Sequence, residues 1–183
     1  MHTPPLWVFG YGSLMWNPGF GFDERRIARL AGYSRSFCMH SIHHRGTPEQ
    51  PGLVLALDAA VGAVCDGLAL RVSPGTETQT LEYLRERELI SSAYLETTVA
   101  VDIVGGGPVD AVTFVVDTHH VQYCGGMALE EQANVIAQAV GGRGPNPDYL
   151  FATTAHLSEL GISDGDLEWL SERVNQILQK TPQ

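Results

Sequence analysis

The stretch Trp7–Trp16, which reads WVFGYGSLMW, joins a short apolar run to a turn that contains two glycines. The run that ends at Phe9 is typical of a short buried strand. Gly10 and Gly12 let the backbone turn sharply and let a ligand approach the main chain closely. Successive N–H groups in such a turn can form a concavity for a carboxylate or a phosphate. The segment is therefore either a ligand-binding turn or an ordinary turn.

The composition is that of a globular protein with an acidic charge balance. Of its 183 residues, 44% are hydrophobic and 17% are charged, and 11 Lys and Arg against 21 Asp and Glu give a net charge of −10. The length fits a single domain, residues 1–183. The chain has no basic block, which argues against nucleic acid and against an anionic membrane surface as partners. It also has no apolar run typical of a signal peptide or a membrane span.

The cysteines and the histidine pairs predict neither a disulfide framework nor a metal site. Cys38, Cys65 and Cys124 are odd in number, far apart and without Cys-x-x-Cys spacing. We expect them to be small core residues of a protein in the reducing cytosol, rather than nucleophiles. The pairs at 43–44 and 119–120 consist of adjacent histidines, whose side chains point to opposite sides of an extended segment. No further ligand stands at metal-binding spacing, so no metal is expected.

Turn residues divide the chain into a first part rich in strands and a helical last third. Strands are expected over residues 6–9, 27–33, 36–42, 52–57, 65–72, 94–104 and 109–116. Helices are expected over residues 77–88, 128–140, 148–160 and 163 to about 179. Gly141 and Gly142 are expected to end the second helix, and Asn146 to cap the third before Pro147. Strands followed by helices indicate an α+β fold, with the strands closing into a small barrel.

Four segments together resemble one family. They are VFGYGSL at 8–14, HRGTP at 44–48 followed by Pro51 and Gly52, YLRERE at 83–88 followed by Tyr94, and, more weakly, GPNPDYL at 144–150. Their order is similar to that of the ChaC-like family, the glutathione-specific gamma-glutamylcyclotransferases, from residue 7 to about residue 175. The resemblance implies a small mixed β-barrel flanked by helices. It is looser at 91–93, where Ser-Ser-Ala stands in place of the glycine that many relatives carry.

The resemblance implies an enzyme that cleaves the gamma-glutamyl amide of glutathione by cyclisation rather than by hydrolysis. The glutamyl α-amine attacks its own γ-carbonyl, which gives 5-oxoproline and Cys-Gly. No metal or organic cofactor takes part, and the partner is a small molecule. Two alternatives remain. One is a cyclotransferase for other gamma-glutamyl amino acids or amines, and the other is a non-catalytic protein that binds a gamma-glutamyl peptide.

The cyclisation needs a general base, because the α-amine is protonated at neutral pH. A carboxylate in a desolvated pocket suits this role, and Glu88 matches the family's catalytic glutamate. Taken without the resemblance, residues 83–88 also look like a solvated helix end. Glu86 lies about 200° around a helix from Glu88, so only one of the two can face a pocket. If Glu88 does, Glu86 is solvated. Arg85 and Arg87 are expected to be surface or ion-pairing residues.

The turn after the first strand matches the family's substrate loop, which by implication holds the glutamyl group through main-chain groups. Its residues are Val8, Phe9, Gly10, Tyr11, Gly12, Ser13 and Leu14. The alternative for Tyr11 is a ring packed at the mouth of the barrel. Ser13 is not expected to be a nucleophile, since it has no G-x-S-x-G context and the cyclisation needs no covalent intermediate.

Arg45 and Tyr149 complete the set of candidate substrate-binding residues. Arg45 suits the glycyl carboxylate of glutathione, because a guanidinium fork matches a carboxylate. Alternatively, Arg45 organises its own loop. Tyr149 matches a family tyrosine that could hydrogen-bond the substrate or Glu88, and its alternative is a half-buried tyrosine early in a helix.

Overall fold

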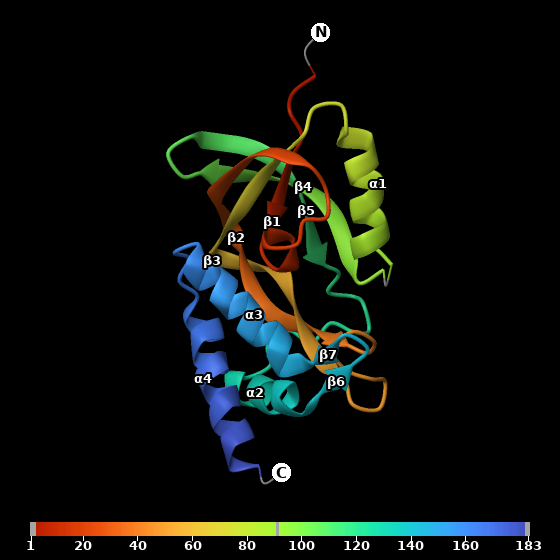
Figure 1. The fold of residues 1–183 in the computed structure, drawn as a ribbon, viewed down its shortest axis with the longest axis vertical. Helices are drawn as coiled ribbons and strands as arrows, with labels where there is room; N and C mark the ends of the chain where they lie inside the picture. The colour runs from red at the N-terminus through yellow and green to blue at the C-terminus, as the bar shows by residue number, and fades with distance from the viewer. Residues whose placement is uncertain (1–2, 91, 182–183) are drawn as a thin grey trace. The chain divides into compact units, whose positions relative to one another are not determined.

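A computed structural model describes residues 3–90 and 92–181, which belong to two compact units (Figure 1). The first unit comprises Met1–Arg35 and Ala56–His120, and the second comprises Ser36–Leu55 and Val121–Gln183. Strands β2 (Phe22–Ser41) and β3 (Gly52–Val72) each contribute residues to both units. That residues 1–183 form a single domain stays a prediction.

The first unit is built on a closed barrel with the strand order β1-β3-β2-β4-β5. Its other strands are β1 (Trp7–Gly10), β4 (Tyr94–Ile103) and β5 (Gly107–Val116). Strand β1 runs antiparallel to β3 and parallel to β5, and β4 and β5 form an antiparallel hairpin. Both the predicted hairpin and the predicted mixed β-barrel are therefore confirmed.

Alternate side chains of β1 enter two different cores. Trp7 and Phe9 belong to a cluster with side chains from every strand of the barrel, which fills its interior. Val8 belongs to a second cluster that includes Leu84 of the helix α1 (Glu77–Glu88). A strand buried on both faces has a continuous apolar sequence rather than an alternating one. Each such side chain contributes roughly 1.5–3 kcal/mol when fully buried.

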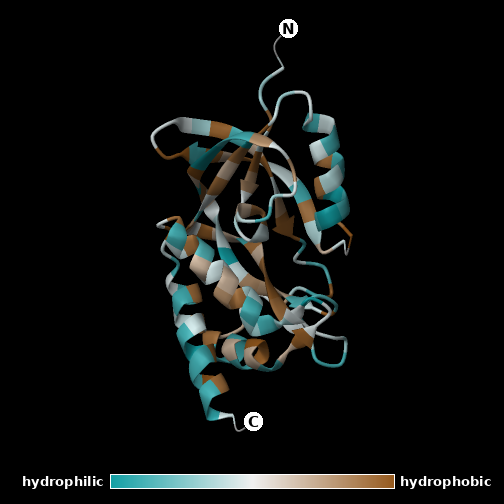
Figure 2. Ribbon diagram, viewed as in Figure 1, coloured by the Kyte–Doolittle hydropathy of each residue, from teal (hydrophilic) through white to brown (hydrophobic). Residues whose placement is uncertain are grey.

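Helix α1 has the bounds that the sequence predicts. Leu84 is fully buried and Leu81 packs beside it, whereas most of the other residues of the helix are hydrophilic (Figure 2). Thr76 occupies the N-cap position, but its hydroxyl donates to the carbonyl of Ser73 at 2.8 Å instead of capping the helix. The tertiary contact of one apolar stripe therefore stabilises this helix more than its cap does.

Strands β2 and β3 are longer than the sequence predicts. The breaks expected after residues 33 and 57 are wrong, because each strand continues to Ser41 or to Val72. Gly32 and Gly62 have φ values of 85° and 79°, in the left-handed region. At these points the backbone departs from the regular extended conformation although the strand continues on both sides, and glycine allows this at little steric cost.

The second unit contains the helical last third of the chain. Its elements are α2 (Leu129–Gln138), β6 (Val140–Gly141), β7 (Gly144–Pro145), α3 (Asn146–Glu159) and α4 (Gly165–Lys180). The hydroxyls of Thr154 and Ser171 lie 2.8 Å apart and join α3 to α4. Arg173 donates to Glu130 at 2.6 Å and joins α4 to α2. The predicted helical C-terminal third is confirmed.

Two of the predicted helix ends are wrong. Helix α2 ends at Gln138, and Gly141 lies in β6, where a Cβ would come within 2.4 Å of the main-chain nitrogen of Gly46. Asn146 does not cap α3, because its side chain is fully buried and forms two hydrogen bonds with Leu53. Its Oδ1 accepts from the N–H of Leu53 and its Nδ2 donates to the Leu53 carbonyl, both at 2.8 Å. The asparagine thus completes the hydrogen bonding of β3 as a neighbouring strand would.

We expect Asn146→Ala to lower the free energy of unfolding by about 2 kcal/mol, because it leaves both buried main-chain groups of Leu53 without these partners. Urea unfolding measures this effect. The matched control is Asn134→Ala, which removes an exposed hydrogen bond to Glu130 within α2. Its expected effect is within about 0.5 kcal/mol. Equal losses in the two variants would contradict the structural role of Asn146.

Candidate active site

The chain turns at the point where β1 ends. Gly12 precedes η1 (Ser13–Met15), a single 3-10 turn. The N–H of Met15 donates to the carbonyl of Gly12 at 2.9 Å, and the N–H of Asn17 donates to that of Ser13 at 2.8 Å. The first N–H groups of a helical turn have no partner inside that turn. The arrangement is therefore able to offer main-chain donors to a ligand.

Most side chains of the predicted substrate loop are buried in the two cores. Val8 and Phe9 are fully buried on opposite faces of β1, and Leu14 packs in the same cluster as Val8. The ring of Tyr11 lies in the barrel core, and its hydroxyl donates to a main-chain carbonyl of β5 at 2.9 Å. These side chains anchor the turn, so this segment would bind a ligand through its main chain or through Ser13.

Arg35 holds the turn and was not identified from the sequence. Its side chain is buried, with the residue 6% exposed. Its Nε donates to the carbonyl of Tyr11 at 2.6 Å, and its Nη2 donates to the carbonyl of Asp66. A buried cation is tolerated when such acceptors surround it. The sequence does contain one indication of this burial. Arg35 alternates with the apolar residues Tyr33 and Phe37, and side chains two positions apart in a strand lie on the same face.

Glu88 is the last residue of α1 and lies on its buried side. It stands one turn after the buried Leu84, and residues four apart share a helix face. Glu86 is exposed, as expected if Glu88 points inward. The Glu88 Oε1 is 3.3 Å from the Nε of Arg87, and the two side chains are only 19% and 20% exposed. Because the carbonyls at a helix C-terminus disfavour an anion, this cation offsets their effect on the carboxylate.

The Arg87 guanidinium also contacts the turn. Its Nη2 donates to the Oγ of Ser13 at 3.0 Å. Its Nη1 donates to the carbonyls of Asn17 at 2.6 Å and Pro18 at 3.2 Å. The structure therefore brings Ser13 and Glu88, which are far apart in sequence, to the same guanidinium. Arg87 is an ion-pairing residue, as the sequence predicts, but its link to the turn was not foreseen.

Arg45 and Tyr149 belong to the second unit, where they contact each other. The guanidinium carbon of Arg45 lies 5.7 Å from the centre of the Tyr149 ring, and its Nη1 donates to the carbonyl of Pro145 at 3.1 Å. The Tyr149 hydroxyl accepts from the N–H of Leu55 at 3.3 Å. These contacts fit an arginine that organises its own loop. Substrate binding by either residue stays a prediction.

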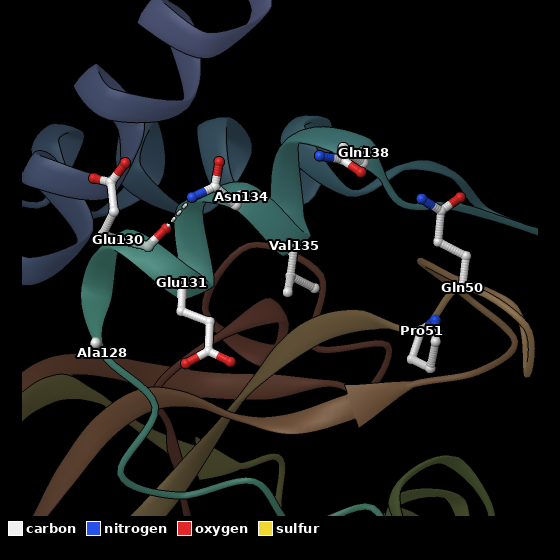
Figure 3. A pocket seen from close by; sticks show the side chains of 8 residues that line it. All are labelled: Gln50, Pro51, Ala128, Glu130, Glu131, Asn134, Val135 and Gln138. Atoms are coloured by element: carbon white, nitrogen blue, oxygen red, sulfur yellow. Dashed lines mark hydrogen bonds between the residues drawn. The ribbon is translucent and has the colours of Figure 1, made fainter.

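A pocket of about 600 Å³ lies between α2 and the segment that leads into β3, within the second unit (Figure 3). It is lined by Gln50, Pro51, Ala128, Glu130, Glu131, Asn134, Val135 and Gln138. Asn134 donates to the main-chain carbonyl of Glu130, as Figure 3 shows. None of the predicted site residues lines this pocket, so it adds nothing to the predicted site.

The thiols have the surroundings of core residues. Cys38 and Cys65 are buried, and Cys124 is partly buried. Burial, with smaller contributions from Cys38 and Glu131, raises the pKa of Cys124 to about 12. A thiol that stays protonated at neutral pH is a poor nucleophile. These surroundings agree with the expectation that the cysteines serve packing rather than catalysis.

Across residues 3–90 and 92–181, no three His, Cys, Asp or Glu side chains are grouped as metal ligands would be. The carbonyls of His43 and His44 accept from the N–H groups of Gly142 and Arg143 at 2.7 and 2.9 Å. These bonds hold the histidine pair beside the loop between β6 and β7. Within the same described ranges, no helix is long and apolar enough to cross a membrane.

The fold is that of solved gamma-glutamylcyclotransferases. A crystal structure of a gamma-glutamylcyclotransferase specific to glutathione from yeast matches with a TM-score of 0.87 and covers 99% of this chain and 100% of that one. The two sequences are 23% identical. At this identity the likeness establishes the fold alone.

Sequence similarity defines the family. The family described as ChaC-like protein matches residues 6–177. The glutathione-specific gamma-glutamylcyclotransferase of Escherichia coli (strain K12) is 39% identical over 174 residues, which cover 95% of this chain and 74% of that protein. Gamma-glutamylcyclotransferase 2-1 of Arabidopsis thaliana is 39% identical over 183 residues, or 94% and 82% of the two chains. The chain therefore belongs to the ChaC-like family, and the resemblance of its motifs is confirmed.

We expect the Cys124 thiol to react with a disulfide reagent much more slowly in the native protein than in concentrated urea. Unfolding removes the burial that raises its pKa, so the thiolate fraction rises, and the rate increases by on the order of 100-fold or more near pH 8. The measurement uses a Cys38→Ala/Cys65→Ala background, in which Cys124 is the remaining cysteine. Equal rates in the two states would show that Cys124 is not protected.

Proposed function

We propose that this protein degrades glutathione by intramolecular cyclisation of the gamma-glutamyl group, with release of 5-oxoproline and Cys-Gly. The proposal is supported by membership of the ChaC-like family and by the activity for which the Escherichia coli relative is named. The observation that carries it structurally is the shared contact of Ser13 and Glu88 with Arg87. That contact unites a turn suited to main-chain binding with a carboxylate suited to proton transfer.

Glu88 is the general acid/base of the proposed reaction. The substrate amine must lose a proton before it attacks the γ-carbonyl, and the leaving nitrogen must gain one. A single carboxylate can accept the first proton and donate it in the second step. The Glu88 side chain is 19% exposed, so it is largely withdrawn from water and yet reachable. Its neighbour Arg87 lies 3.3 Å away and fixes the position of the carboxylate.

The turn at residues 10–14 is the proposed binding element for the glutamyl moiety. Its main-chain N–H groups would hold the α-carboxylate and would stabilise the oxyanion that develops on the γ-carbonyl. The five-membered ring closes only if the amine and the carbonyl are held close together, so positioning contributes directly to the rate. Arg45 and Tyr149 stay predicted substrate-binding residues. The proposed compartment is the cytosol, where glutathione keeps thiols reduced.

The first test incubates the purified protein with reduced glutathione in the presence of a chelator and measures products by mass spectrometry. We expect equal amounts of 5-oxoproline and Cys-Gly from the wild type and little of either from Glu88→Gln, which keeps the shape but lacks the base. Glu86→Gln is the matched control, because Glu86 is exposed on the same helix. Free glutamate in place of 5-oxoproline would mean hydrolysis. Full activity of Glu88→Gln would exclude Glu88 as the base.

The second test compares turnover of glutathione with turnover of gamma-glutamyl-alanine. We expect kcat/KM to be at least about tenfold higher for glutathione, which corresponds to about 1.4 kcal/mol of transition-state binding. A clear preference for the dipeptide would instead support the cyclotransferase for other gamma-glutamyl compounds. Binding of glutathione in a calorimeter without turnover of either compound would support the non-catalytic alternative.

A further inference from the structure

The last turn of α1 carries two arginines with different surroundings. Arg85 forms a two-pronged pair with Glu96, at 2.7 and 3.0 Å, and its side chain is 50% exposed. Surface pairs of this kind contribute about 0–1 kcal/mol. The Arg87 side chain is 20% exposed and contacts η1, the segment that follows η1, and Glu88. Arg85, which makes only an exposed surface ion pair, is therefore a suitable control for Arg87, which joins α1 to the turn.

Each nitrogen of the Arg87 guanidinium is directed at an acceptor of the protein. Nη1 approaches the carbonyls of Asn17 and Pro18 and the hydroxyl of Tyr83, Nη2 approaches Ser13, and Nε approaches Glu88. A guanidinium has five N–H donors in a rigid planar fork. Because Nη1 and Nη2 already donate to protein atoms and Nε lies beside Glu88, the group is not arranged as a receptor for a substrate carboxylate. Any effect of Arg87 on catalysis must therefore act through the groups that it contacts, Ser13 and Glu88.

Tyr83 extends the same network. It lies one helical turn before Arg87, and the two side chains are joined by a hydrogen bond of 3.1 Å. Gly19, with a φ of 75°, packs so closely on Tyr83 that a Cβ there would lie 2.0 Å from the hydroxyl oxygen. The segment from Ser13 to Gly19 is therefore held against α1 by hydrogen bonds at its start and by close packing at its end.

We propose that Arg87 is a positioning residue, which sets the substrate turn at Ser13 and the base Glu88 in a fixed geometry relative to each other. The inference rests on the proposed function of these two residues. The cyclisation requires that the amine reach the base while the turn holds the same glutamyl group. A misplacement of about 1 Å between such groups costs on the order of 100-fold in rate.

The shape of the guanidinium is essential to this role. Lysine carries one nitrogen, whereas the acceptors around Arg87 lie in several directions at distances of 2.6 to 3.3 Å. Lysine therefore keeps the charge but cannot make all of these contacts at once. Arg87→Lys is therefore expected to recover less than about a tenth of the activity lost in Arg87→Met. The positive charge alone does not restore the positions of Ser13 and Glu88.

Steady-state kinetics of the protein with glutathione test the proposal. We expect Arg87→Met to lower kcat by at least about tenfold and up to the order of 100-fold, with KM changed by less than about threefold. The turn keeps its own main-chain groups in this variant, so binding is affected less than the chemical step. The control, Arg85→Met, is expected to retain kcat within about twofold. A wild-type kcat in Arg87→Met, or an effect confined to KM, would overturn the proposal.

A double-mutant cycle separates positioning from a general loss of structure. If Arg87 acts through the turn, Ser13→Ala lowers kcat in the wild-type background and has little further effect in the Arg87→Met background. In the Arg85→Met background, Ser13→Ala is expected to lower kcat as much as it does in the wild type. Additive losses at Ser13 and Arg87 would contradict the proposal. If Arg87→Met does not fold, as judged by circular dichroism, the same cycle is measured with Arg87→Lys.

Hydrogen exchange gives a readout that does not depend on activity. Loss of the Arg87 hydrogen bonds to the turn should raise the hydrogen-exchange rates of the amides in residues 13–19 by about tenfold in Arg87→Met. The exchange rates of the barrel amides should be unchanged. Arg85→Met should leave both sets unchanged. Unaltered exchange in residues 13–19 would overturn the positioning role even if the protein turned over no glutathione. Conversely, an inactive wild type with the expected exchange result would reject only the proposed function.

Discussion

The burial of β1 on both faces is the constraint from which the geometry of the first unit follows. Phe9 points into the barrel, and Val8 points toward Leu84 of α1. Hydrogen bonds to β3 on one edge and to β5 on the other leave the strand little freedom to shift. The turn that follows Gly10 must therefore emerge at one place. Since α1 packs on the outer face of the same strand, the end of α1 is brought to that turn.

Two arginines then hold the turn by different means. Arg35 is buried and donates to the main-chain carbonyl of Tyr11, whereas the Arg87 side chain is 20% exposed and donates to the side chain of Ser13. Charge-assisted hydrogen bonds of this kind are stronger than neutral ones. They also carry direction, because a guanidinium is planar. Main-chain and side-chain atoms of the glycine-containing turn, whose apolar side chains are already anchored in the cores, are thus given defined positions.

The segment after Glu88 places a residue other than glycine in the left-handed region of backbone conformation. The chain has Ser-Ser-Ala at 91–93, in place of the glycine implied by the resemblance. Ser92 has a φ of 57°, and its N–H donates to the carbonyl of Leu89 at 3.1 Å. This left-handed conformation is one that glycine adopts freely and that costs other residues roughly 1–2 kcal/mol. Ser92 therefore adopts a conformation that a glycine would adopt at lower cost.

Local patterns were sufficient to predict much of the fold and part of the site. The bounds of α1, the β4–β5 hairpin and the helical last third follow from apolar periodicity and from turn residues, which act over a few positions. The same periodicity predicts that Glu88 and Glu86 face different sides of their helix. The long strands were predicted in pieces, because Gly62 and the polar residues at 34–35 resemble turn residues when the pairing of the strands is unknown.

The partners of the polar side chains were decided by the tertiary structure. Arg87 meets Ser13 across 74 positions, and Asn146 meets Leu53 across 93. An arginine in a charged helix end and an asparagine before a proline each have an ordinary local explanation, which the sequence pattern favours. By itself the sequence determined which segments form strands, helices and the glycine turn, because those depend on neighbouring residues. Which charges and amides hold that framework together depended on contacts that exist only after distant segments have packed.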